Sequence, residues 1–89
     1  MVQKIEEKVC NYFGIDRRLV VDKNHIINAS LARGYLWYIL HYDCCMSVNA
    51  IAKHYQRNPR SVNKLIAKVK YLVTTQRLYK EHYDKIKLL

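Results

Sequence analysis

Basic side chains recur along one stretch of the chain at a spacing that places them on one side of a helix. Arg60, Lys64 and Lys68 follow one another at intervals of four, and Asn63 lies beside Lys64. Residues four apart lie one above another on a helix, so these side chains should form a line. Lys and Arg can neutralise phosphates, whereas Arg and Asn can hydrogen bond to the edges of guanine and adenine. Taken alone, such a line is usually an ordinary solvated helix face, and contact with DNA is favoured by the line together with a tight turn, a capped helix start and the overall positive charge.

The line falls within a predicted helix-turn-helix over about residues 47–73. The first helix has apolar or small residues on one face, namely Val48, Ile51, Ala52 and Tyr55. After a break at 56–58, Asn58 is suited to be the N-cap of a second helix and Pro59 its first residue. This second helix, over about 59–73, is the candidate recognition helix, because the second helix of such a motif enters the major groove of DNA.

Two helical segments are predicted near the N-terminus. Residues 2–13 have an amphipathic pattern in which Glu6 belongs to the charged face expected to contact water, and Gly14 should end this helix. Asp16 can then cap a short helical turn over 17–20. These elements should cover one side of the core.

A long helix is predicted next, after a loop over 21–27. Asn28 or Ser30 should cap it, and it should run to about Asp43. It is apolar over most of its circumference, which predicts that it is the central packing element. Gly34 within it costs about 1 kcal/mol relative to alanine, which indicates a close approach of another helix there.

The chain ends with a further predicted helix. Ser47 caps the first helix of the helix-turn-helix, and Thr74 or Thr75 should end the second and cap a last helix over 76–88. The residues of the last helix expected to face the body are Leu78, Tyr79, Tyr83, Ile86 and Leu89. No strand pattern occurs. The sequence therefore predicts an all-α fold of five to six helices around a helix-turn-helix, as a single domain over 1–89.

Charge and composition narrow the class of partner. The 89 residues include 16 Lys and Arg and seven Asp and Glu, for a formal net charge of +9. Such a charge density favours a polyanionic partner, with nucleic acid as the first candidate and an anionic membrane surface as the second. The three cysteines are odd in number and two are adjacent, which favours reduced thiols in a reducing compartment. Without an apolar segment of signal or membrane-spanning length, we expect a cytoplasmic, nucleoid-associated protein.

Other reactive residues do not form a recognisable site in the sequence. Cys44 and Cys45 lie near His41, but adjacent cysteines are poorly placed to bind one metal ion. No nucleophile, acid–base pair or phosphate-binding Gly-Lys loop occurs, so we expect no enzyme activity, no cofactor, no metal and no small-molecule substrate. The helical spacing of the eight tyrosines favours packing roles for most of them over stacking on single strands.

The motif resembles that of a known family. The segment 47–62 reads SVNAIAKHYQRNPRSV. Residues 47–52 correspond to the Ser-Leu-Pro-Glu-Ile-Gly that opens the family signature, and Tyr55 corresponds to a phenylalanine of that signature. Residues 56–62 correspond to Gly-Gly-Arg-Asp-His-Thr-Thr-Val, with one residue fewer in the turn. The stretch 33–69, and more loosely the whole chain, resembles the C-terminal DNA-binding domain of the bacterial replication initiator DnaA, a Trp-repressor-like helix-turn-helix.

The resemblance implies roles for particular residues. Arg57 matches the motif arginine, and Asn58 matches an aspartate that caps the recognition helix and approaches a base. Arg33 falls at a basic position near the DNA backbone, and Lys23 and His25 lie in the region of a loop that enters the minor groove. Pro59 and Arg60 replace the histidine and the first threonine of the family, whereas Ser61 keeps the second hydroxyl. We therefore expect this chain to read a DNA sequence of its own.

The expected function is sequence-specific binding of double-stranded DNA by a replication or transcription accessory protein or regulator. The predicted DNA-contacting residues are Lys23, His25, Arg33, Lys53, Arg57, Asn58, Pro59, Arg60, Ser61, Asn63, Lys64 and Lys68. The alternative is a protein-interaction module whose basic face docks an acidic partner in replication or transcription. No membrane partner is expected in either case.

Overall fold

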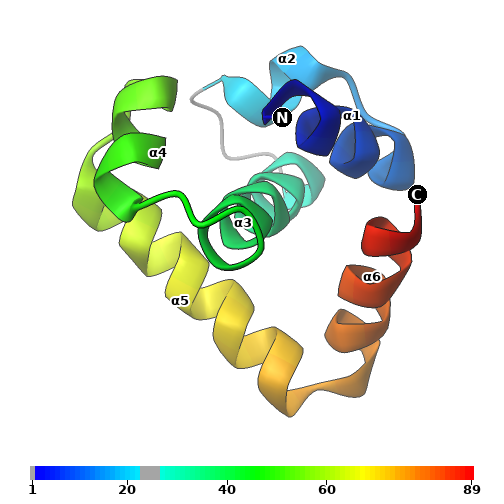
Figure 1. Ribbon diagram of the computed structural model, residues 1–89. Helices are drawn as coiled ribbons and strands as arrows, with labels where there is room; N and C mark the ends of the chain where they lie inside the picture. The colour runs from blue at the N-terminus through cyan, green and yellow to red at the C-terminus, as the bar shows by residue number, and fades with distance from the viewer. Residues whose placement is uncertain (1, 23–26) are drawn as a thin grey trace.

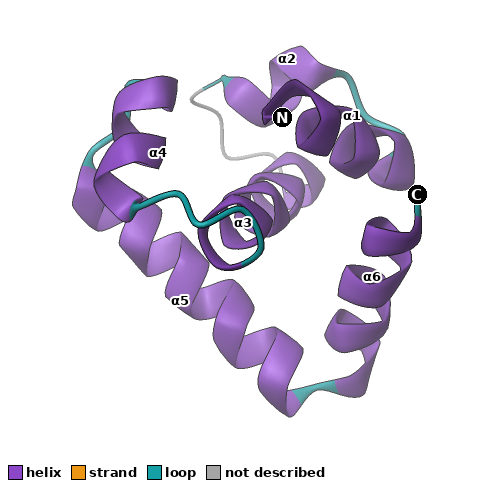
Figure 2. Cartoon of the chain, in the orientation of Figure 1, coloured by secondary structure: helices purple, strands orange, loops and turns teal. Residues whose placement is uncertain are grey.

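The computed structural model describes residues 2–22 and 27–89. Within these ranges the chain forms helices and short connections without a strand (Figure 2), which confirms the predicted all-α class. The helices are α1 (Val2–Phe13), α2 (Arg17–Val21), α3 (Ile27–Tyr42), α4 (Val48–Tyr55), α5 (Pro59–Thr75) and α6 (Arg77–Leu88). None of them has the length and apolar character that crossing a membrane requires.

Helix α3 is the central element of the fold. Figure 1 looks nearly along its axis, with the other helices arranged around it. Every residue from Ala32 to Leu40 is buried, and α3 packs against α1, α2, α4 and α5. The predicted central role is confirmed, although the helix begins at Ile27 and therefore before both predicted caps, Asn28 and Ser30.

The predicted signals at the ends of α1 and α2 are present in the structure. Gly14 adopts the left-handed region at φ 65°, and the N–H of Ile15 donates to the carbonyl of Cys10 at 3.1 Å, which satisfies a free carbonyl at the end of α1. The Asp16 carboxylate then accepts a hydrogen bond from the N–H of Arg18 at 2.8 Å and caps α2. The chain thus turns tightly from α1 into α2.

Gly34 lies where α3 and α5 approach each other closely. A Cβ atom built on Gly34 would lie 2.6 Å from Cγ2 of Val69 and 3.4 Å from the Leu65 side chain. The predicted close approach of another helix is therefore confirmed. The absence of a side chain at Gly34 allows α5 to lie close to α3 there.

We expect Gly34→Ala to destabilise the fold. Overpacking a well-filled core costs about 1–3 kcal/mol, whereas the gain in helix propensity is about 1 kcal/mol, so the net loss should reach about 2 kcal/mol. Urea unfolding monitored by circular dichroism measures it. In a Val69→Ala background the added methyl group has room, so Gly34→Ala should there be neutral or stabilising. An equal effect in both backgrounds would contradict the assigned contact.

Some expected boundaries and orientations are wrong. Helix α5 ends at Thr75, one of the two predicted positions, but neither threonine caps α6, because their hydroxyls donate to carbonyls of the preceding turn, at Lys70 and Tyr71. Gln76 instead occupies the junction with α6, without a side-chain cap. Two residues predicted to face the body, Leu78 and Leu89, are 59% and 57% exposed.

Candidate nucleic-acid interface

The α4–turn–α5 unit is built by local signals in its sequence. The Ser47 hydroxyl accepts a hydrogen bond from the N–H three residues ahead at 3.0 Å and begins α4. Gln56 ends α4 in the left-handed region at φ 54°, and the N–H of Arg57 donates to the carbonyl of Ala52 at 2.8 Å. Asn58 Oδ1 then accepts from the N–H two residues ahead at 2.8 Å and caps α5. The predicted helix-turn-helix segment is thus present, with α5 extending to Thr75.

One side of this unit is fixed to the core. Ile51 and Ala52 of α4 are buried. So are four residues of α5 that recur at helical spacing, namely Val62, Ile66, Val69 and Val73. Because the apolar stripe of α5 faces α3 and α4, the opposite face of α5 is left to the solvent.

The solvent face of α5 carries the polar residues that the sequence predicts for DNA contact. Those found exposed there are Arg60, Ser61, Asn63, Lys64 and Lys68. Lys53, on the exposed side of α4, is also open to solvent. Arg60, Lys64 and Lys68 form no ion pair with any described residue, so their charges remain available to a partner.

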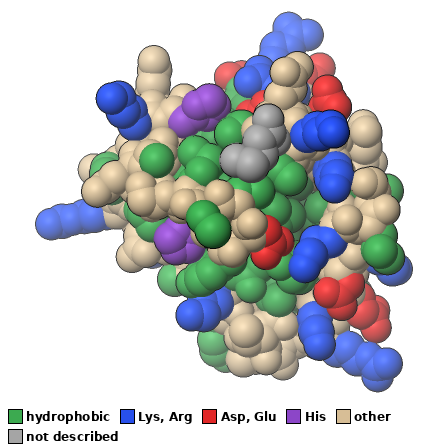
Figure 3. Space-filling model, viewed as in Figure 1, with side chains coloured by type: hydrophobic (Ala, Val, Ile, Leu, Met, Phe, Trp, Pro, Cys, Tyr) green, Lys and Arg blue, Asp and Glu red, His purple; other side chains and the backbone are tan. Residues whose placement is uncertain are grey.

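This basic face lies in a segment without acidic residues. Between residues 44 and 80 the sequence has eight Lys and Arg and no Asp or Glu. The seven acidic residues are Glu6, Glu7, Asp16, Asp22, Asp43, Glu81 and Asp84. In the view of Figure 3, the part of the surface over α4 and α5 shows Lys and Arg but no acidic side chain. The basic face of α5 therefore has no acidic residue within its own segment of the chain, whereas elsewhere Arg and acidic residues pair, as Arg77 does with Glu81.

Arg57 is turned towards the protein. Its guanidinium donates to the carbonyl of Val21 at 2.7 Å and lies 5.7 Å from the centre of the Trp37 ring. Burial of the guanidinium lowers the pKa of Arg57. These contacts tie the turn of the helix-turn-helix to the end of α2. Positioning the turn is therefore its role in the structure.

Arg33 does not lie where a phosphate contact requires it. It is only 5% exposed, and its guanidinium donates to the carbonyls of Val20 and Asp22, each at 2.6 Å. Burial, and next the charge of Arg57, lower the pKa of Arg33. The predicted contact of Arg33 with the DNA backbone is therefore corrected, since the side chain binds the end of α2 from within. The predicted contacts of Lys23 and His25 lie outside the described residues.

Asn58 and Pro59 have structural roles at the start of α5. The Asn58 side chain is engaged as the N-cap, and Pro59 occupies the first helical turn, where its missing N–H leaves no helix hydrogen bond unmade. Both side chains are exposed. They lie at the N-terminal end of α5, which is the end that a recognition helix places closest to the bases.

A buried carboxylate holds α4 against α1, and sequence reasoning missed it. Glu6 is 3% exposed rather than solvated, because its two oxygens accept from Tyr55 Oη at 2.6 Å and Arg17 Nε at 3.0 Å. Burial, followed by the hydrogen bond to Glu6, raises the pKa of Tyr55. The available signal was the spacing of Glu6 from Val9 and Cys10, which places it on the apolar stripe of α1.

The arrangement offers an exposed, positively charged helix face. No group of three or more His, Cys, Asp or Glu side chains able to hold a metal ion occurs among the described residues. No protein-family model matches the chain, and no curated protein matches it. The geometry of α4 and α5 is therefore what a functional proposal has to rest on.

Proposed function

We propose that this chain binds double-stranded DNA through the exposed face of α5, with the first half of the helix in the major groove. Arg60, Asn63 and Lys64 reach base edges there, and Lys53 and Lys68 lie on phosphates. The observation that carries the proposal is the exposed basic and amide-bearing face of α5, in a segment without acidic residues.

The chemistry of this face suits DNA. An α-helix fits the major groove, and residues near the N-terminus of the second helix lie closest to the bases. Arg can pair with guanine and Asn with adenine, for about 1–3 kcal/mol of discrimination per bidentate contact. Lys contacts to phosphates add affinity that weakens as salt displaces the protein from the polyanion.

The resemblance to the DnaA C-terminal domain supports a more particular role. On that basis we propose an accessory protein or regulator of replication or transcription, acting in the cytoplasm on the nucleoid. Pro59 and Arg60 differ from the family residues at the bases. Its preferred site therefore differs from the initiator box, and selection from a random duplex pool should enrich a different motif.

Removal of two cations from the α5 face tests the proposal. We expect Arg60→Ala/Lys64→Ala to raise the Kd for duplex DNA about 30-fold or more, since two contacts of at least about 1 kcal/mol each are lost. The slope of log K against log salt should change by less than about 1, because both side chains are assigned to base edges and not to phosphates. Fluorescence anisotropy at several salt concentrations measures both quantities.

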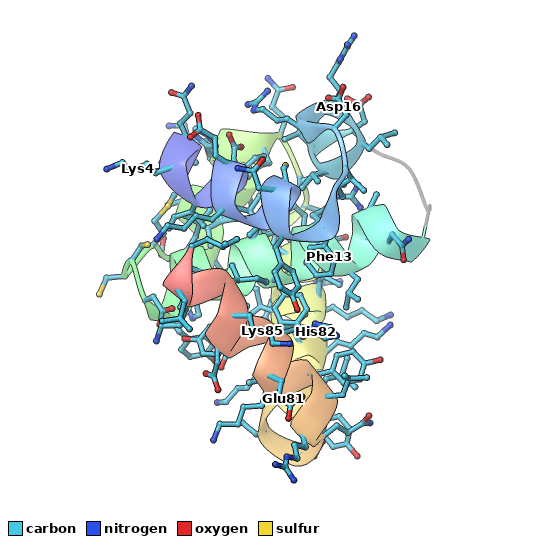
Figure 4. The ribbon with its side chains drawn as sticks, turned by 90° about the vertical axis from the view of Figure 1, so that its right-hand side faces the viewer. Lys4, Phe13, Asp16, Glu81, His82 and Lys85 are labelled. Atoms are coloured by element: carbon cyan, nitrogen blue, oxygen red, sulfur yellow. The ribbon has the colours of Figure 1, made fainter. Side chains whose placement is uncertain are left out.

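A matched control removes the same charge elsewhere. Lys4 of α1 and Lys85 of α6 are exposed and lie on the side of the molecule shown in Figure 4. Lys4→Ala/Lys85→Ala should change the Kd less than about threefold, because only the long-range field is weakened. If the two double variants bind alike, α5 is not the DNA-contacting face.

The second candidate is a module that docks an acidic protein. It is favoured by the inward orientation of Arg33 and Arg57, which removes two cations from the surface predicted to meet phosphates. Stable capture of an acidic partner, with no duplex binding at physiological salt, would establish this alternative. Salt-sensitive duplex binding that depends on Arg60 and Lys64 would exclude it as the primary role.

A further inference from the structure

An apolar cavity lies next to the basic face of α5. It has a volume of about 310 Å³ and is lined by residues of α3, α5 and α6, and α5 packs against both of the other helices. Its lining residues are Ser30, Leu31, Leu65, Lys68, Val69, Leu72 and Tyr79. Small-molecule sites are typically about 300–1,000 Å³ and mostly apolar, with a few polar groups that orient the ligand. The cavity therefore has the size and lining of a site for a small ligand.

The polar groups of the lining select the ligand by charge. Lys68 is the only charged residue among the described residues that line the cavity, and Ser30 and Tyr79 carry hydroxyl groups. No described residue forms an ion pair with Lys68, and the floor is made of Leu and Val side chains. Leu65 and Val69 pack close to Gly34 of α3 at this end of the cavity.

We propose that this cavity binds a small apolar carboxylic acid. The hydrocarbon body lies against Leu31, Leu65 and Leu72, and the carboxylate accepts hydrogen bonds from the Lys68 ammonium and the Ser30 hydroxyl. A charge-assisted hydrogen bond at the rim of an apolar site distinguishes the acid from a neutral compound of the same shape.

Occupation of the cavity regulates DNA binding. This step rests on the proposed function, in which Lys68 contacts a phosphate. A carboxylate paired with Lys68 neutralises that cation and places a negative charge beside the DNA backbone. The bound acid therefore weakens DNA binding, and DNA weakens binding of the acid by the same factor.

The ligand site is tested without DNA. The methyl resonances of Leu31, Val69 and Leu72 are followed by NMR during titration with 3-phenylpropionate and with its neutral amide at constant ionic strength. We expect saturable shifts and a Kd at least tenfold lower for the acid. Lys68→Gln should reduce this preference to less than twofold, whereas Lys64→Gln, one turn away and outside the lining, should keep it. Absence of saturable shifts, equal affinity for acid and amide, or an unchanged preference in Lys68→Gln overturns the site.

The regulatory step is tested separately with duplex DNA. Saturating acid should raise the Kd of the unaltered protein for DNA at least threefold, and the amide should leave it unchanged. Equal Kd values with and without the acid overturn the regulation while leaving the cavity site intact. A failure of the protein to bind DNA at all counts against the proposed function and not against the cavity, because the NMR titration contains no DNA.

Discussion

Trp37→Ala is expected to lower the free energy of unfolding by about 3–5 kcal/mol, the loss typical of a large aromatic side chain removed from a core. The indole is 2% exposed in the middle of α3. Small domains are stable by about 5–15 kcal/mol in total, so this change consumes a large part of the stability of the fold. Urea unfolding followed by far-ultraviolet circular dichroism measures it, since the only tryptophan fluorophore is removed.

The effect of Trp37→Ala should extend to the helix-turn-helix. The ring of Tyr55 lies 6.0 Å from that of Trp37, and the guanidinium of Arg57 lies over the indole. Both residues belong to α4 and its turn, so the indole supports the unit that presents α5. We therefore expect the variant to show weaker protection from hydrogen exchange in α4 than in α1.

Two further variants separate packing from hydrogen bonding. The indole Nε1 is buried and has no hydrogen-bond partner among the described residues, so Trp37→Phe loses volume but no polar contact seen there and should cost less than Trp37→Ala. Tyr71→Ala removes a large aromatic side chain that is 63% exposed and should change stability by less than about 0.5 kcal/mol. Comparable losses in Trp37→Ala and Tyr71→Ala would be incompatible with α3 as the centre of the core.

Signals that act within a few residues predicted much of the fold. The bounds of α1, the caps at Asp16, Ser47 and Asn58, and the left-handed Gly14 all depend on neighbours in the chain. The close approach at Gly34 was also predictable, because a glycine within an apolar helix is otherwise unfavourable. Local chemistry therefore set where the helices begin and end in most cases.

Buried charge is where prediction from the sequence was wrong. Glu6 was expected to contact water as part of the charged face of an amphipathic helix, and Arg33 was expected near the DNA backbone because of the family resemblance. Their partners are distant in sequence: Tyr55 for Glu6, and the carbonyls at the end of α2 for Arg33. Arg33 lies within the run of consecutive buried residues in α3, so the apolar character of its neighbours was the better guide.

The orientation of the exposed residues of the candidate interface was easier to predict than that of Arg57, whose side chain packs against the protein. Arg60, Lys64 and Lys68 recur on one face of an amphipathic helix, and their exposure follows from burial of the opposite stripe. The orientation of Arg57 depends instead on Trp37 and on the carbonyl of Val21, which the fold brings to the turn. Helical periodicity thus predicts a surface but not which long side chains fold back onto it.

Alkaline pH is expected to destabilise the protein steeply through three tyrosines. Burial is the first cause that raises the pKa of Tyr35, Tyr55 and Tyr83. Hydrogen bonds to Glu6 and Asp43 add to the increase for Tyr55 and Tyr83 respectively. In the unfolded chain a tyrosine ionises near pH 10. The folded state therefore keeps protons that the unfolded state releases.

The sign follows from this difference in bound protons. Below about pH 10 the three phenols are neutral in both states, and their contribution to stability is fully present. As pH rises above 10, towards the higher pKa values of the folded state, stability falls by at most about 1.4 kcal/mol per pH unit for each tyrosine. Urea unfolding between pH 8 and 11.5 measures the slope, and tyrosinate absorbance near 295 nm reports ionisation.

A phenylalanine variant isolates one of the three phenols. Tyr55→Phe cannot ionise, so it should flatten the alkaline fall by up to about 1.4 kcal/mol per pH unit. It also loses the hydrogen bond to Glu6, so at pH 8 it should be less stable than the parent by about 1–3 kcal/mol. The two free-energy curves should therefore converge as pH rises. Parallel curves would show that Tyr55 contributes nothing to the alkaline transition, and Tyr71→Phe, altered at an exposed ring, gives the comparison slope.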